Sequence, residues 1–455
     1  MRQTRQISRR GFLRLSAATV AGAAAVACVP AAPATDMTGE GEGAPAAEMV
    51  ELVYWYDNSY PEATMTQAGE EFNESQTNIS IEMVPLPYGE AIQKVYVALA
   101  GGEAPFDLTF NHPMQRATYA VRGVLVPLND YIEADPRVNV DNFYPGLVEN
   151  LSWQGQVYAI ADGAHPMFVM YNPRLMEEAG LQDPWEVYQE GGWTLEKWER
   201  EYAGALSVGE GAEKQWGRTP MSRTIRLENL WIWGFGGDVW NEDNTATVIN
   251  EAEAIEAWNW MADTTKMGFT PTPAEAEEFR GGAEMMNTER VAMGFYHREI
   301  LPYLREDLVL GQVPLPEMPN GPTITRNPPE GPGIYTGSEH PDEAWEYVAF
   351  NTNRGHELLI IAHYGDPTSP EVAESDLWLK QGLKDWETPE VIDIAAAQVT
   401  RVILHIPGIR EMDALIQGAW DEILLDRKTA QEAMDEVKPD VDQLIAEYRE
   451  EYGDF

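Results

Sequence analysis

Apolar and polar positions alternate with two different periods in the region that begins near position 50. Residues 52–56 (LVYWY), 79–84 (ISIEMV) and 106–110 (FDLTF) are short apolar or alternating runs, which are typical of strands. Between them, residues 61–73 and 88–102 repeat apolar side chains at the three- and four-residue spacing of a helix. Strands that alternate with helices predict a parallel, doubly wound sheet with right-handed crossovers.

A second region of the same kind begins near Pro166. Residues 167–172 (MFVMYN) predict a strand, and residues 173–181 predict a helix that ends near Gly180. Residues 191–206 predict a further helix with Thr194 as its N-cap. The pattern of residues 253–268 is also helical, as is nearly all of the last 45 residues. Because about 400 residues follow Met49, too many for one core, we expect an α/β fold with two lobes.

The ends of the predicted strands indicate where a ligand would bind. In open α/β sheets, ligands bind beyond the carboxyl ends of the strands. The segments after Tyr56 (DNSY) and after Phe110 (NHPM) occupy such positions. We therefore expect both segments to lie at the ligand site.

The first residues of the chain resemble export signals. Arg9 and Arg10, followed by Phe12 and Leu13, resemble a twin-arginine signal, whose cargo is exported folded. Residues 25–28 (AVAC) resemble a bacterial lipobox, although alanine stands at position 25 where leucine is usual. We predict a signal peptide over residues 1–27 and lipidation of Cys28. A membrane-spanning anchor over residues 12–29 is the alternative, but the run is rich in alanine and glycine and shorter than the roughly 20 residues that a spanning helix needs.

Composition narrows the possible partners. Residues 28–48 are rich in proline, alanine, glycine and glutamate, which predicts a flexible tether. Cys28 is the only cysteine, so no disulfide can form within the chain. The net charge of −44 disfavours nucleic acid, anionic lipid and anionic ligands, and leaves neutral or cationic solutes open. Adaptation to salt is another possible reason for this acidity.

Motifs of common enzymes and metal sites are missing from the sequence. It contains no GxSxG, no Walker loop and no GxGxxG. In HELLIIAH (356–363) the histidines are seven residues apart rather than four, so they do not form a zinc motif. DVWNEDN (238–244) lacks the spacing and glycine of a calcium loop and predicts a turn. We therefore predict neither a metal nor another cofactor.

Several phrases in a fixed order resemble the extracellular solute-binding proteins of family 1, the maltose-binding type, which deliver sugars to ABC importers. The phrases are RGVLVPLNDYIEAD (122–135), GQVYAIA (155–161), YNPRLMEEAGL (171–181), GGWTLEKWEREYAGAL (191–206), VAMGFY (291–296), GIYTGSEHPDEAWEYVAFN (333–351) and AWDEILLDRKTAQEAMDEVKPDVDQLI (419–445). The resemblance implies two doubly wound α/β lobes, a hinge of several chain crossings and a ligand cleft between the lobes, as in type II periplasmic binding proteins.

Carried over to this chain, the resemblance places the hinge crossings near residues 160–166, 326–334 and 362–366. The N-terminal lobe would then comprise residues 50–162 and 327–362. The C-terminal lobe would comprise residues 163–326 and 363–455.

Sugars present flat C–H faces and a rim of hydroxyl groups, so aromatic rings and polar side chains near the strand ends and crossings are the candidate ligand contacts. Within WIWGFGGDVW (231–240), we expect Trp231 and Phe235 in the core and Trp233 and Trp240 near the ligand. The alternatives are a core position for Trp55, turn formation by Asn111 and His112, and an ordinary polar contact for His165. The full set of predicted contacts is Trp55, Asp57, Asn58, Asn111, His112, His165, Trp233, Trp240, Tyr296, His297, Tyr335, Arg410 and Asp413.

The sequence thus predicts a monomeric, non-enzymatic solute-binding component of an ABC importer. We expect it to bind a carbohydrate, foremost an oligosaccharide, and to deliver it to permease subunits in the membrane. A lipid on Cys28 would hold it on the outer face of the cytoplasmic membrane. The alternatives are a secreted glycoside hydrolase, whose reaction needs only a pair of carboxylates, and the same fold with a peptide, polyamine or polyol as ligand.

Overall fold

The structure is a computed structural model that describes residues 49–455, apart from 102–103, 145, 222–223, 321–327 and 398–405. Residues 48–455 form one compact unit. The predicted signal peptide (1–27), Cys28, the tether (28–48) and the first residues of the crossing at 326–334 lie outside the described residues.

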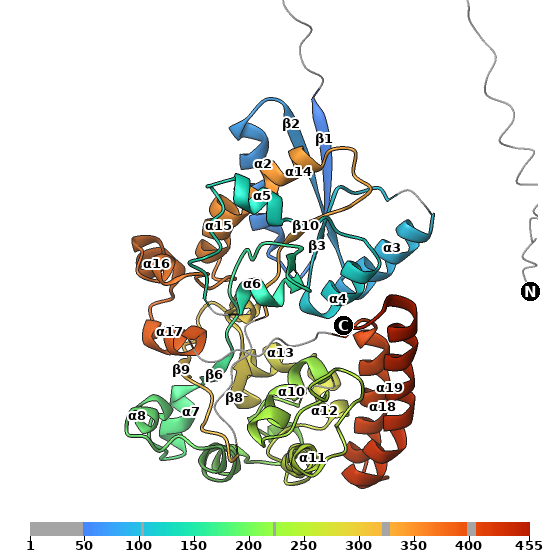
Figure 1. Cartoon of the computed structure of the whole chain (residues 1–455). Helices are drawn as coiled ribbons and strands as arrows, with labels where there is room; N and C mark the ends of the chain where they lie inside the picture. Colours follow the sequence, from blue (N-terminus) through green and yellow to red (C-terminus); the bar gives the residue numbers. More distant parts are fainter. Residues whose placement is uncertain (1–48, 102–103, 145, 222–223, 321–327, 398–405) are drawn as a thin grey trace, which may run out of the picture. The chain divides into compact units, whose positions relative to one another are not determined.

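The first sheet contains β1 (Val50–Asp57), β2 (Ile79–Leu86), β3 (Leu108–Phe110) and β10 (Pro332–Ile334) in the order β10-β3-β1-β2 (Figure 1). β1 pairs in parallel with both β2 and β3, which confirms the arrangement predicted for these three strands. β10 comes from much later in the chain and pairs antiparallel with β3, so the sheet is mixed.

Helices with one apolar face cover this sheet. α2 (Glu62–Ser75) buries Met65, Ala68 and Phe72, the spacing expected from the sequence. Met65 and Phe72 share a core with α14 (Pro341–Phe350), through Tyr347 for example. The other elements of this part are α3 (Tyr88–Gly101), α4 (Pro113–Val121), α5 (Asn129–Ala134), α6 (Leu147–Asn150), β4 (Ser152–Trp153), β5 (Gln156–Val157) and α15 (His356–Ile361).

The second sheet contains β6 (Phe168–Tyr171), β7 (Trp216–Arg218), β8 (Val291–Tyr296) and β9 (Gly311–Val313) in the order β7-β8-β6-β9. β6 pairs antiparallel with both β8 and β9, whereas β7 and β8 are parallel. Of these four strands, the apolar pattern of the sequence predicted only β6. The molecule is therefore an α/β protein with two mixed sheets.

Tryptophans fill the core beside the second sheet. Trp198, Trp231 and Trp258 are all fully buried, and the Trp198 and Trp231 rings stack with centroids 5.6 Å apart. The elements here are α7 (Pro173–Glu178), α8 (Pro184–Gln189), a π-helical segment (Lys197–Ala203), α9 (Gly204–Leu206), α10 (Ile225–Gly234), α11 (Ala252–Lys266), α12 (Pro273–Glu278), α13 (Gly282–Asn287), α16 (Pro370–Ala373) and α17 (Pro389–Ala397). The Oγ1 atom of Thr194 accepts a hydrogen bond from the amide of Lys197 (3.2 Å), which confirms it as a cap.

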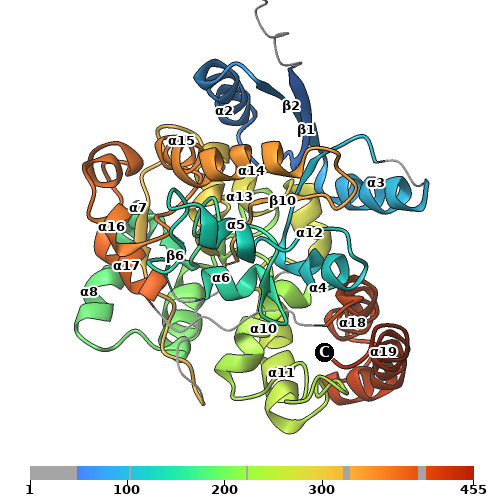
Figure 2. The same cartoon turned by 45° about the horizontal axis from the view of Figure 1, so that its top comes forward.

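Two long helices complete the fold. α18 (Ile409–Leu424) and α19 (Ala430–Tyr452) lie side by side, as both views show (Figures 1 and 2). α18 contacts α10 and α11 and also α4, so it connects the second sheet's helices with a helix of the first sheet.

The chain runs between the two sheets in segments that lie side by side. The amide of Asp162 donates to the carbonyl of Glu330 (3.1 Å). The main chains of Ala164 and Asp366 exchange two hydrogen bonds of 3.0 Å each. Segments around residues 162–164, 330 and 366 are therefore tied to one another by backbone hydrogen bonds.

Candidate functional site

The carboxyl end of β1 carries three of the predicted residues. The carboxylate of Asp57 is buried and accepts a hydrogen bond from the amide of Ser59 (2.8 Å), which shapes the loop that follows the strand. Asn58 is exposed, and its amide donates to the carbonyl of Leu86 at the end of β2. Trp55 is half-buried and packs on Phe106, with ring centroids 4.7 Å apart.

Asn111 and His112 follow β3, the parallel neighbour of β1, so they lie at the same edge of the sheet. His112 caps α4: its Nδ1 atom accepts a hydrogen bond from the amide of Met114 (3.1 Å). Its Nε2 atom lies 3.5 Å from a carboxylate oxygen of Glu330. The alternative for these two residues was a local structural role in a turn. His112 has such a role, because its ring caps α4.

The side chain of Asn111, like those of Thr109 and Gln115, is buried without a hydrogen-bond partner for its polar atoms among the described residues. It is 0% exposed, and neither Oδ1 nor Nδ2 forms a hydrogen bond with the described residues. Buried polar atoms nearly always have a partner in the protein, an ordered water or a ligand. The amide of Asn111 is therefore a group that a bound hydroxyl or water would satisfy.

His165 lies in the first crossing segment, shortly before β6. Its ring packs edge-on against Tyr364 (5.7 Å between centroids) and His297 (6.3 Å). Burial, helped by the charge of Arg298, lowers the pKa of His165 to about 4, so the ring is neutral at pH 7. The Nδ1 atom of His297 contacts the carbonyl oxygen of His165, and these two predicted residues are thus brought together.

Tyr335 and Trp55 are distant in sequence but belong to one aromatic cluster. Phe106 contacts both: its ring centroid lies 5.1 Å from that of Tyr335 and 4.7 Å from that of Trp55. Trp55 also packs against the main core of the first sheet, so it links that core to this cluster. The rings of Trp55, Phe106 and Tyr335 are therefore buried in part by packing against one another.

Tyr296 lies at the end of β8 and is only partly exposed. A methyl group on Gly294 would lie 2.4 Å from a ring carbon of Tyr296, and one on Gly282 would lie 2.0 Å from its hydroxyl oxygen. The ring therefore rests on two glycines that leave it space. Burial raises the pKa of the Tyr296 hydroxyl well above its usual value, so the group stays protonated.

The WIWGFGGDVW stretch is mostly core. Trp231 and Phe235 are buried as predicted, and the chain turns at Gly236, where φ is +89°. Trp233 is also buried, with its indole N–H donating to Asp238 (3.0 Å). Trp240 is partly buried, and its backbone forms an isolated antiparallel β-bridge with that of Thr247. Contact of Trp233 or Trp240 with a ligand stays a prediction.

Arg410 and Asp413 lie in the first turns of α18. Arg410 is half-buried. The carboxylate of Asp413 accepts hydrogen bonds from the amide of Ile225 (2.7 Å), the hydroxyl of Thr224 (3.0 Å) and the side chain of Gln417 (2.7 Å). Asp413 thereby holds the first residue of α10, a structural role that the sequence did not indicate.

Sequence reasoning missed the polar side chains that surround Asp162 of the first crossing segment. The hydroxyl of Tyr60 donates to the buried carboxylate of Asp162 (3.1 Å), and Asn351 lies 3.5 Å from the same carboxylate. Desolvation by burial raises the pKa of Asp162 to about 7, although the hydrogen bonds oppose the shift. No motif marks these residues; a lone aspartate in an Ala/Gly run between predicted lobes was the one available signal.

A buried ion-pair network joins the third crossing to the second sheet's helices. Arg298 is 0% exposed and donates to the carboxylate of Glu387 at 2.6 and 2.8 Å. It also donates to Asp366 (3.3 Å) and to the carbonyl of Gly365 (3.2 Å). Burial raises the pKa of Asp366 to about 8, whereas Arg298 keeps the pKa of Glu387 below its usual value.

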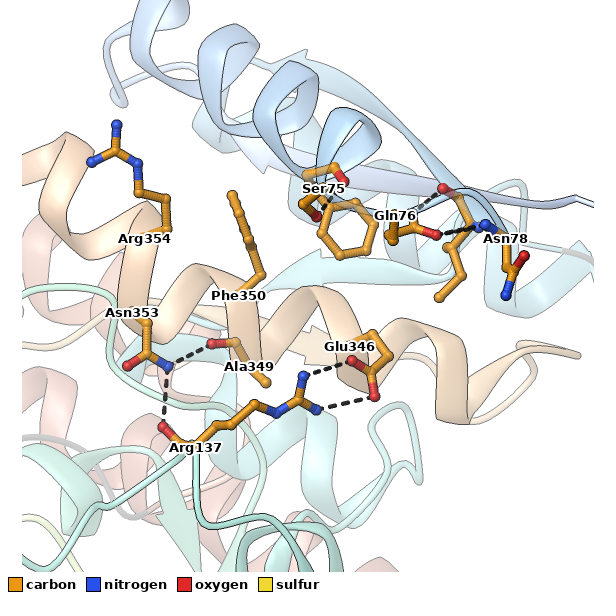
Figure 3. Close-up of a pocket in the computed structure, with 11 residues that line it drawn as sticks. Ser75, Gln76, Asn78, Arg137, Glu346, Ala349, Phe350, Asn353 and Arg354 are labelled. Atoms are coloured by element: carbon orange, nitrogen blue, oxygen red, sulfur yellow. Dashed lines mark hydrogen bonds and ion pairs between the residues drawn. The ribbon is translucent and has the colours of Figure 1, made fainter.

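Two surface pockets lined by described residues lie away from the predicted contacts. The larger, about 650 Å³, has Phe72, Ile79 and Phe350 among its lining residues. Figure 3 shows the guanidinium of Arg137 directed at the carboxylate of Glu346. Two guanidinium nitrogens donate to the two carboxylate oxygens, at 2.8 and 3.0 Å. The smaller, about 390 Å³, has amide and hydroxyl side chains among its lining residues, including those of Asn139, Thr352, Thr368 and Ser369. Neither contains a predicted site residue.

In the described part of the chain, no cluster of three or more histidine, cysteine or acidic side chains is arranged to hold a metal ion. Within the same residues, every helix is too short or too polar to cross a bilayer.

Comparisons with known proteins give the fold family. An ABC substrate-binding protein from Listeria monocytogenes in complex with cycloalternan has a TM-score of 0.76 and 19% identity, over 88% of this chain and 100% of that chain. A solute-binding protein from Agrobacterium radiobacter in complex with ribitol has a TM-score of 0.75 and 18% identity, over 87% and 99%. Maltose-bound MalE3 of T. maritima has a TM-score of 0.72 and 18% identity, over 87% and 100%. These likenesses show a shared fold, whereas no significant match was found among curated protein sequences.

The family itself comes from a sequence model described as "Bacterial extracellular solute-binding protein", which matches residues 57–355, more than half of the chain. The family is non-catalytic and acts outside the cytoplasm, which removes the secreted glycoside hydrolase from the alternatives. The expected resemblance and the two-sheet α/β fold are both confirmed. The chain belongs to the bacterial extracellular solute-binding proteins.

Proposed function

We propose that the protein is the solute-capturing component of an ABC importer and that its ligand is a neutral sugar or polyol. Three proteins of the same fold support this proposal, because they are described with cycloalternan, ribitol and maltose bound. The net charge of −44 fits an uncharged ligand better than an anionic one. Among sugars, an oligosaccharide remains our first candidate.

The observation that carries the proposal is the set of polar groups where β1 and β3 end. Asn111 offers a buried amide without a described partner, and His112 lies beside Glu330 on the second crossing. A sugar hydroxyl both donates and accepts hydrogen bonds, so it matches an amide and a carboxylate equally well. Asp57 ends the neighbouring strand and Asn58 follows it, while His165 of the first crossing and His297, which follows β8, contact each other.

Capture would follow from movement of two lobes about the crossings. We propose the lobes 50–162 plus 327–362 and 163–326 plus 363–455, which contain one four-stranded sheet each. A ligand that contacts both lobes binds the closed state better than the open one and shifts the population toward it. A micromolar Kd requires a net binding free energy of about −8 kcal/mol, within reach of a few stacked rings and hydrogen bonds. Permease subunits would then recognise the closed form.

Export and anchoring belong to the same proposal. Residues 1–27 would direct twin-arginine export, Cys28 would carry a lipid on the outer face of the cytoplasmic membrane, and residues 28–48 would tether the folded monomer. A tethered receptor is held close to its permease, which raises their effective concentration.

A thermal-shift screen with linear and cyclic glucans, monosaccharides, polyols, amines and short peptides tests the proposal. We expect stabilisation by a carbohydrate or polyol, followed by a measurable Kd in calorimetry. Stabilisation by a peptide or amine alone would make the sugar assignment wrong. Peptide or polyamine would then replace sugar as the solute, with the fold unchanged.

A further inference from the structure

Ser59, in the loop after β1, is held by two tyrosines from distant parts of the chain. The hydroxyl of Tyr303 donates to the main-chain carbonyl of Ser59 (2.6 Å). The hydroxyls of Tyr364 and Ser59 lie 3.3 Å apart, in hydrogen-bonding contact. Tyr303 follows β8 of the second sheet, whereas Ser59 follows β1 of the first.

The Tyr303 end of this contact is fixed to the second sheet's side. Tyr303 is the last residue of a 3-10 helix, Arg298–Tyr303, and Arg298 anchors that helix through its buried bonds to Glu387. The carbonyl of Tyr303 accepts a hydrogen bond from Asn287 (3.0 Å), at the end of α13. The phenol ring therefore projects from a well-held segment.

The Ser59 end is equally well held on the first sheet. The Ser59 amide donates to Asp57, and the Asn58 amide donates to Leu86 of β2 (2.9 Å). Since neither end can move by itself without losing these bonds, a change in the distance between the sheets must break the Tyr303–Ser59 bond. Tyr303 is 52% exposed, so water can replace its partner and the bond can open at small cost.

We propose that Tyr303 is a positioning residue for solute capture: its bond to Ser59 fixes how close the loop at residues 57–60 stays to the second sheet. The loop carries Asp57 and Asn58, two predicted ligand contacts, so the bond sets how often the site is assembled before ligand arrives. The inference rests on the proposed function in assuming that capture involves lobe movement.

Spin-label distance measurements on the unliganded protein test this role. Labels would be placed at the exposed positions Glu74 on α2 and Asn259 on α11, by Glu74→Cys and Asn259→Cys with Cys28→Ser. The test variant is Tyr303→Phe. The matched control is Tyr131→Phe, which removes a hydroxyl bond of similar length to Asp342 (2.8 Å) between α5 and α14, both on the first sheet's side.

We expect the unsubstituted background to show a population at the distance that this structure predicts. Tyr303→Phe should lower that population relative to longer distances by about two- to tenfold, the effect of losing one modest hydrogen bond. Tyr131→Phe should leave the distribution unchanged. Ser59→Ala removes the contact with Tyr364 but keeps the carbonyl that Tyr303 uses, so its effect should be smaller than that of Tyr303→Phe.

Equal distributions for Tyr303→Phe and Tyr131→Phe would overturn the inference, as would a background without the predicted distance. Melting temperatures of both variants within a few degrees of the background would show that each is folded. Because the measurement uses no ligand, its result is independent of whether the solute is a sugar. Failure of the ligand screen and failure of Tyr303 as a positioning residue are therefore separate outcomes.

Discussion

Gly331 lies directly against the carbonyl oxygen of Ile160. A methyl group at position 331 would come within 1.9 Å of that oxygen, far inside van der Waals contact. The two residues belong to different crossing segments, which the Asp162–Glu330 backbone bond also joins. The crossings are therefore packed backbone to backbone, with no space for a side chain.

Gly331→Ala should consequently push the two segments apart. We expect a loss of about 1–3 kcal/mol in the free energy of unfolding, measured by urea titration, together with weaker ligand binding. Gly418→Ala is the matched control: this exposed glycine inside α18 has no atom within 4 Å of the added carbon. It should stabilise the protein by up to about 1 kcal/mol. Equal stability of the two variants would show that the close approach is easily relieved.

Asn111→Ala should separate binding from stability. Removing a buried amide without a described partner leaves nothing newly unsatisfied, so the unliganded melting temperature should stay the same or rise. Affinity for the solute found in the screen should fall at least about tenfold, as for a lost hydrogen bond to a polar ligand. Calorimetry and melting curves would measure both.

The control for this experiment is Asn150→Ala. The Asn150 side chain donates to the carbonyl of Gly146 (2.9 Å), so its loss should lower the melting temperature while the Kd stays unchanged. If Asn111→Ala gave this same pattern, Asn111 would be a structural residue and the proposed site would lose its central group.

Glu387→Gln should destabilise the protein strongly. The substitution leaves the fully buried guanidinium of Arg298 without its bidentate carboxylate, and breaking such a pair typically costs about 3–5 kcal/mol. Asp376→Asn, which breaks the exposed pair with Lys380, should change stability by less than about 1 kcal/mol. Denaturant titration of both variants compares the two, and a small effect at Glu387 would mean that Asp366 alone suffices to balance Arg298.

Asp162→Asn should change how stability depends on pH. Because burial raises the pKa of Asp162 to about 7, the folded state holds this proton more tightly than the unfolded state does. The stabilisation that this proton gives to the folded state is fully present below the unfolded pKa of about 4 and is lost as the pH rises through 7. Relative to the wild type, the variant should gain about 2–3 kcal/mol in unfolding free energy between pH 5 and pH 8. If the unfolding free energies of the wild type and the variant changed in parallel with pH, the pKa of Asp162 would not be raised by folding.

Cys28→Ala should release the protein from membranes. Without the thiol no lipid can be attached, so fractionation should move the protein to the soluble extracytoplasmic fraction and a fatty-acid label should no longer be incorporated. Arg9→Lys combined with Arg10→Lys should instead retain the protein inside the cell, as expected for a twin-arginine signal. Membrane association that persists in Cys28→Ala would make the lipidation prediction wrong.

The sequence anticipated the elements that carry a long regular pattern. β1, β2 and α2 have eight or more residues each, and their periodicity is clear. β10 has three residues, Pro-Gly-Ile, which contain no period at all, so its antiparallel place beside β3 is decided by packing alone. The mixed character of both sheets was beyond sequence reasoning for this reason.

In the candidate site, too, some features follow from local sequence pattern and others depend on packing between distant segments. Strand ends pointed to Asp57, Asn111 and His112, because the parallel topology of β1 and β3 follows from the sequence. The partners of these residues depend on the crossings, where Glu330 comes within 3.5 Å of His112 from over 200 positions away. No local pattern encodes a pairing at that separation.

The late position of β10 also constrains the order in which the chain can fold. While the protein is being synthesised, the first sheet lacks the strand beside β3 until residue 334 has left the ribosome. Until then the far edge of β3 stays open to pairing with other chains, a known route to aggregation. An export route that accepts only finished, folded cargo would give such a chain time to close that edge inside the cell.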